Sequence, residues 1–88
     1  MITYKRYQNI ANENLEKEAD RLERECINPQ LEKGVPYLGR GRPEAASFNA
    51  TSVDPRVITI LLKRAAKAGW EADCPLGGWF TLYEPERK

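Results

Sequence analysis

Residues 54–83 read DPRVITILLKRAAKAGWEADCPLGGWFTLY and carry the clearest secondary-structure signals in the chain. Asp54-Pro55 predicts a helix start, because an acidic N-cap is followed by proline at the first helical position. Apolar residues then recur every three or four positions, so we expect the helix to reach about Ala68 and to end before Gly69. Its predicted buried face comprises Val57, Ile58, Leu61, Leu62, Ala65 and Ala68.

A β-hairpin is predicted directly after this helix. Trp70 to Cys74 alternates apolar and acidic residues, as a half-buried strand does. Pro75-Leu76-Gly77-Gly78 is typical of a turn, and Trp79 to Tyr83 is rich in the aromatic and β-branched residues that favour strands.

The N-terminal part of the chain predicts one long helix over residues 4–26. Its apolar residues fall on one face, and Asn28-Pro29 is expected to end it, because a residue before proline disfavours the α region. This face could pack on the core, or it could pair with a second copy of the chain in a homodimer through helix 4–26. Its members are Tyr4, Tyr7, Ala11, Leu15, Ala19, Leu22 and Cys26.

Residues 30–53 are rich in glycine and proline and predict an irregular basic loop. Within it, Glu44 to Phe48 could form a short helix, or Ser47 to Val53 could form an edge strand. The fold class expected is therefore α+β in one small domain, residues 1–88. It comprises a long N-terminal helix, the loop, a second helix and a C-terminal antiparallel hairpin, with a winged-helix-like arrangement or a third strand as variants.

Composition is that of an ordinary soluble chain of 88 residues, 41% hydrophobic and 31% charged. The longest apolar stretch, Val57 to Leu62, is too short to span a bilayer. The N-terminal residues lack the apolar core of a secretory signal. We therefore expect a cytoplasmic protein without a membrane partner.

Catalysis and metal binding are not expected. The chain has no histidine, and its two cysteines, Cys26 and Cys74, are far apart and without metal-ligand spacing. In a reducing cytosol both are expected to be free thiols. Glu71 and Asp73 are better explained as charges that protect a strand edge than as ligands. We expect no enzyme activity, no cofactor and no metal.

Charge is unevenly distributed along the chain. Residues 33–67 carry seven basic and two acidic side chains, whereas acidic side chains outnumber basic ones on either side of this segment. A positive middle between negative ends is a reason to consider an anionic partner.

The basic segment contains the motif Arg40-Gly41-Arg42-Pro43. This motif resembles the core of the AT-hook, the minor-groove peptide of chromatin proteins. Gly39 to Pro43 is also similar to the Gly-Arg-rich loop of bacterial nucleoid-structuring proteins. The resemblance implies that Arg40 and Arg42 enter the narrow minor groove of A·T-rich DNA. The match covers five residues, lacks basic flanks, and is followed by Glu44, which would lie close to a phosphate.

The predicted function is therefore non-catalytic binding of nucleic acid, with DNA as the first partner and RNA or another anion as alternatives. The Arg40–Pro43 loop would contact the minor groove. The helix after Asp54 would contact phosphates through Arg56, Lys63, Arg64 and Lys67.

The competing prediction is a small protein-binding inhibitor or adaptor, of the kind that phages encode against host machinery. Its surface would be the aromatic hairpin, with Trp79 and Tyr83 as binding residues if they are exposed, or the long N-terminal helix.

Overall fold

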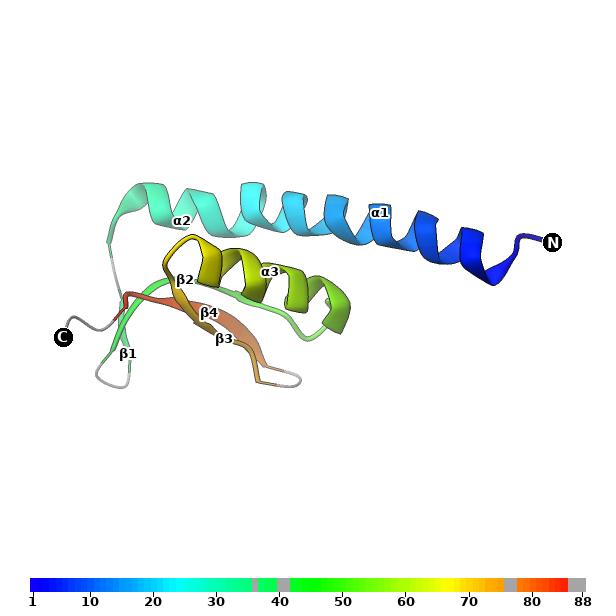
Figure 1. Cartoon of the computed structure of the whole chain (residues 1–88). Coiled ribbons are helices and arrows are strands. Elements are labelled where there is room, and N and C mark those ends of the chain that lie inside the picture. The colour runs from blue at the N-terminus through cyan, green and yellow to red at the C-terminus, as the bar shows by residue number, and fades with distance from the viewer. Residues whose placement is uncertain (36, 40–41, 76–77, 86–88) are drawn as a thin grey trace.

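A layer of helices lies on one side of a four-stranded antiparallel sheet in the computed structural model of the chain (Figure 1). The structure describes residues 1–35, 37–39, 42–75 and 78–85. Within these ranges the elements are α1 (Tyr4–Leu22), the π-helical turn η1 (Glu23–Ile27), α2 (Asn28–Lys33), β1 (Tyr37–Gly39), β2 (Arg42–Asn49), α3 (Pro55–Lys67), β3 (Glu71–Asp73) and β4 (Trp79–Tyr83). The α+β class expected from the sequence is confirmed.

The N-terminal helix is longer than predicted. Thr3 caps its start by accepting a hydrogen bond from the Arg6 amide. The prediction that the helix ends at Asn28-Pro29 is wrong, because α2 continues it to Lys33. Pro29 lies in the first turn of α2, directly after the wider π turn of η1. A π turn shifts the hydrogen-bond ladder by one residue, which lets the helix accommodate a residue that lacks an amide proton.

The helix predicted after Asp54 is present as α3 and follows the prediction closely. The Asp54 carboxylate accepts a hydrogen bond from the Arg56 amide at 2.8 Å, and Pro55 occupies the first turn. After the last turn, Gly69 adopts a φ of 93°, a value that favours glycine. Ala68 is exposed and not buried as predicted, because the chain already leaves the helix there.

The segment predicted as an irregular loop, residues 30–53, instead contains α2, β1 and β2. The short helix proposed for Glu44 to Phe48 is wrong, because these residues belong to β2. The sheet order is β1-β2-β4-β3, so β2 is an inner strand, with β1 and β4 as its antiparallel neighbours. The predicted hairpin is present as β3 and β4 but is not a free wing, because β4 also pairs with β2.

The hydrophobic core lies between the helices and the sheet. Phe48 and Phe80 stack across β2 and β4 with ring centroids 5.2 Å apart. From the helical side, Leu22 of α1 and Leu61 of α3 are buried against the same cluster. Within the described residues, this arrangement leaves the opposite face of the sheet without a covering layer (Figure 1).

Candidate functional site

The arginine-glycine motif lies at the start of β2. Arg40 and Gly41 fall outside the described residues. The backbone of Arg42 pairs with Gly39 across β1 and β2, and Pro43 follows it in the strand. The Pro43 carbonyl accepts a hydrogen bond from the Glu84 amide at 3.1 Å, which joins this end of β2 to the residue after β4.

The predicted phosphate-contacting residues of α3 differ in their surroundings. The Arg56 guanidinium lies 2.9 Å from the Asp54 carboxylate, which also caps the helix. Lys63 and Lys67 are exposed on the solvent side of α3. Arg64 points instead toward α1. The four residues therefore do not form one basic stripe.

Arg64 is held by three carboxylates of the N-terminal helix. Its guanidinium nitrogens lie 2.8 Å from Glu23, 2.7 Å from Asp20 and 2.5 Å from Glu16. Hydrogen bonds to Glu23 and Asp20 raise the pKa of Arg64 above its ordinary value. A guanidinium with three acidic partners has little capacity left for a phosphate, so we read Arg64 as a structural residue.

Sequence reasoning missed this cluster, although the sequence contained a signal for it. Glu16, Asp20 and Glu23 follow one another at steps of four and three, so they share one face of a helix. That face lies next to the buried Ala19 and Leu22, which places the acidic side chains beside whichever element packs on α1. The identity of that element, α3, was not apparent from periodicity.

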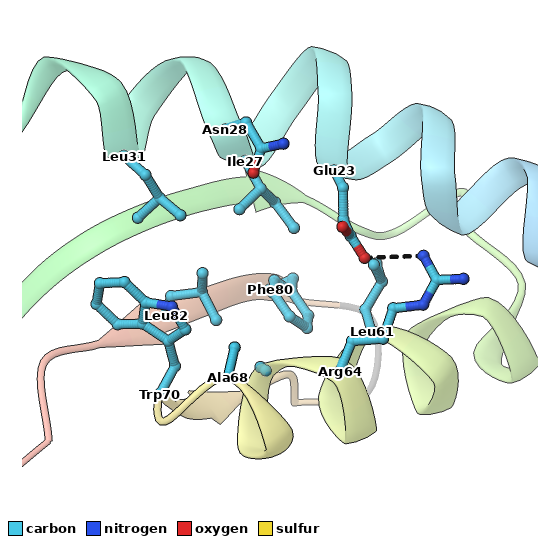
Figure 2. A pocket seen from close by; sticks show the side chains of 11 residues that line it. Glu23, Ile27, Asn28, Leu31, Leu61, Arg64, Ala68, Trp70, Phe80 and Leu82 are labelled. Atoms are coloured by element: carbon cyan, nitrogen blue, oxygen red, sulfur yellow. Dashed lines mark hydrogen bonds and ion pairs between the residues drawn. The ribbon is translucent and has the colours of Figure 1, made fainter.

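A small cavity opens beside the Glu23–Arg64 ion pair, between the helices and the sheet. Figure 2 shows its lining, with Ile27 and Leu31 above and Trp70, Phe80 and Leu61 below. Its volume is about 110 Å³, well under the roughly 300 Å³ at which ligand pockets begin. We interpret it as a packing gap rather than a binding site.

The basic candidates lie on different parts of the fold. Arg42 starts β2, beside the edge strand β1, whereas α3 packs on β3 at the other edge of the sheet. Lys63 and Lys67 belong to α3. Arg42 and the exposed lysines therefore lie near opposite edges of the sheet.

The uncovered face of the sheet, called the open face below, carries the aromatic candidates. Paired residues of neighbouring strands point to the same side of a sheet, and Leu82 points to the core. Its neighbours in sequence, Thr81 and Tyr83, therefore belong to the open face. Register assigns to this face the positions of Tyr37, Gly39, Arg42, Glu44, Ser47, Asn49, Glu71, Asp73, Trp79, Thr81 and Tyr83.

Trp79 is the most prominent side chain of the open face, with 56% of its surface exposed. Tyr83 is half-buried, and Thr81 between them is buried to 8% exposure by its cross-strand neighbours Ser47 and Asp73. The centre of the face is therefore well packed, with an aromatic side chain at each end of β4.

Three carboxylates accompany these aromatic side chains. Glu44 and Glu71 flank Tyr83 on either side, and Asp73 flanks Thr81. A basic residue, Arg42, also occupies an open-face position, two residues before Glu44 in β2. The described positions of this face therefore carry both acidic and basic residues.

Comparison of the chain with protein-family models, with curated proteins and with solved structures found no match in any of the three. Helices in the described part of the chain do not combine the length and apolarity needed to cross a membrane. The described residues also hold no cluster of three cysteine or acidic side chains arranged for a metal ion.

Proposed function

We propose that this chain is a non-catalytic protein-binding module, an inhibitor or adaptor, which docks its partner on the open face of the sheet. The observation that carries the proposal is the exposure of Trp79, at 56%, on a face that no helix covers. Tryptophan and tyrosine dominate the residues that contribute most to protein–protein binding.

The layout of the open face supports this function. The aromatic side chains of Trp79 and Tyr83 stand two positions to either side of a buried Thr81 on an inner strand. A rigid strand holds them at fixed spacing, so little side-chain entropy is lost when a partner covers them. Loops rarely offer such preorganisation.

The charge of the open face indicates the kind of partner. Glu44 and Asp73 place carboxylates beside the aromatic side chains, and carboxylates attract basic groups of a partner. A protein surface with exposed lysine or arginine around an apolar centre would complement this face. Complementary charge would act mainly on the association rate.

A matched pair of variants tests the proposal. A partner captured by the wild-type chain should be lost by Trp79→Ala, with affinity reduced by about 30-fold or more, as for a residue that dominates an interface. The control is Lys63→Ala, which truncates an exposed side chain of α3 and leaves both the open face and the first turns of α1 intact. Equal retention of the partner by both variants, measured by surface plasmon resonance, would contradict the proposal.

Nucleic-acid binding remains a second candidate, because Lys63 and Lys67 are exposed and the sequence holds the motif Arg40-Gly41-Arg42-Pro43. The variant Arg40→Ala/Arg42→Ala should abolish a preference for A·T-rich duplex, whereas Lys63→Ala/Lys67→Ala should weaken binding to all sequences alike. A gel-shift titration at low salt measures both. Absence of any shift with DNA or RNA would reject this candidate and leave protein binding.

A further inference from the structure

The first turns of α1 extend beyond the rest of the molecule (Figure 1). Residues 1–10 are all exposed. Their apolar side chains include Tyr4 at 73%, Tyr7 at 55% and Ile10 at 41% exposure. This stretch therefore presents an apolar helix surface that the described part of the chain leaves uncovered.

Local sequence gives this part of the helix little stability of its own. Its first turn contains no acidic residue to complement the helix dipole, and Lys5 and Arg6 there oppose the dipole. Asn9, Asn12 and Asn14 are weak helix formers. Helical turns without tertiary contacts are marginal in water, so a partner that covers them would stabilise them.

A cleft lies beside the exposed stretch, between α1 and the start of α3. Its volume is about 460 Å³, and its lining includes Tyr7, Ile10 and Asn14 from α1 and Val53 and Val57 from the other side. The α1 members recur at steps of three and four, so the cleft runs along the helix. A second helix could lie in it.

Net charge along α1 favours a second copy of the chain as the occupant. Residues 1–12 carry Lys5 and Arg6 and no acidic side chain, whereas residues 13–25 carry six acidic and three basic side chains and stay net negative after the ion pairs with Arg64. In an antiparallel pair of α1 helices, the basic half of each copy lies beside the acidic half of the other. In a parallel pair, like halves would be neighbours and would repel.

We propose that the chain forms a homodimer through antiparallel pairing of α1, with the two helices crossing near Ala11. Alanine at the crossing permits close approach of the two backbones, and Tyr4 and Tyr7 of each copy then cover the middle of the partner helix. The proposal is independent of the open face, because Trp79 lies on β4 and takes no part in it.

Sedimentation velocity over a range of protein concentrations tests the association. The wild-type chain should change from monomer to dimer as concentration rises. Tyr7→Ala should raise the dissociation constant at least tenfold, whereas the uncharged control Asn9→Ala, on the opposite side of the same exposed turns, should change it little. Trp79→Ala should dimerise normally, which separates this proposal from the proposed function. A wild-type chain that stays monomeric up to about 1 mM would overturn the proposal, because binding weaker than this is not a specific association.

Disulfide formation tests the orientation. In a Cys26→Ser/Cys74→Ser background, Ala11→Cys should oxidise to a covalent dimer, because the two copies meet at this position. Tyr4→Cys should not, because antiparallel pairing separates the two ends. Efficient cross-linking at position 4 would indicate parallel pairing and contradict the proposal.

Discussion

Asp54 carries two interactions that a single substitution removes together. Its carboxylate caps α3 through the Arg56 amide and pairs with the Arg56 guanidinium at 2.9 Å. The hydrogen bonds from the Arg56 side chain and amide hold the pKa of Asp54 below its ordinary value of 3.8. The cap and the ion pair are local features, and the sequence pair Asp54-Pro55 already predicts the cap.

Asp54→Ala should lower the thermal midpoint of unfolding by a few degrees at pH 7, because α3 loses its N-cap. Asp54→Asn, which keeps an acceptor oxygen, should lower it less. Because the folded-state pKa lies below the unfolded one, the stabilisation is present above pH 3.8 and disappears as pH falls through the lowered pKa. Thermal melts from pH 7 to pH 2 should therefore bring wild type down to Asp54→Asn, which has the same uncharged acceptor, while Asp54→Ala stays below both. A constant difference between wild type and Asp54→Ala would exclude a role of the charge.

At the scale of elements, side chains join the helical layer to itself and to the sheet. Arg64 joins α3 to α1 through Glu16 and Asp20, and to η1 through Glu23. Gln30 joins α2 to β2: its side-chain nitrogen donates to the Ser47 carbonyl at 2.7 Å, and its oxygen accepts from the Ser47 amide at 3.1 Å. The side-chain amide of Gln30 thus replaces a neighbouring strand at Ser47. β1 pairs with β2 only from Arg42 to Glu44 and does not reach this residue.

Gln30→Ala should reduce the free energy of unfolding by about 1–3 kcal/mol, because it leaves the polar backbone atoms of Ser47 without their partner. The same substitution also removes a hydrogen bond of 2.6 Å to the Cys26 carbonyl. Gln8→Ala, at an exposed position of α1, is the control and should be close to neutral. Urea titration followed by circular dichroism measures both, and equal effects would show that the Ser47 pairing contributes nothing.

At the scale of the whole molecule, the long N-terminal helix makes the shape elongated, with extents of 52 × 24 × 24 Å. The core is assembled from the second half of α1 onward, where Ala19 and Leu22 are buried. The exposed turns before it contribute to shape and to available surface rather than to the core.

At protein concentrations where the chain is monomeric, deletion of residues 2–10 should therefore change the free energy of unfolding by less than about 1 kcal/mol, because no buried side chain is removed. Chemical denaturation of the shortened chain measures the effect. A loss of several kcal/mol would show that the first turns of α1 belong to the folding unit.

Periodicity and capping residues account for the parts of the fold that were predicted correctly. The 3.6-residue pattern identified both long helices, and Asp54-Pro55 and Gly69 marked the bounds of α3 within a residue or two. Residues 30–53 resisted prediction because β1 is three residues long and β2 contains a proline and small residues. Such segments become strands through pairing with distant partners, which no local pattern records.

The candidate binding residues could also be identified from the sequence, but their exposure and grouping could not. The sequence identified Trp79 and Tyr83 as binding residues if exposed, and it identified Arg56, Lys63, Arg64 and Lys67 as one basic set. Exposure of Trp79 depends on which face of the sheet the helices cover, and the fate of Arg64 depends on which helix packs beside α3. Neither is a local property.

The sequence by itself determined the two long helices, the bounds of α3 to within a residue or two, the C-terminal hairpin and the separation of charge along the chain. These follow from interactions between residues a few positions apart, which spacing reports directly. Only the tertiary structure decided that β2 is an inner strand, that Pro29 lies within a continuing helix, and that Arg64 faces Glu16, Asp20 and Glu23. These depend on contacts between residues far apart in the chain, whose energies arise only when the layers pack together.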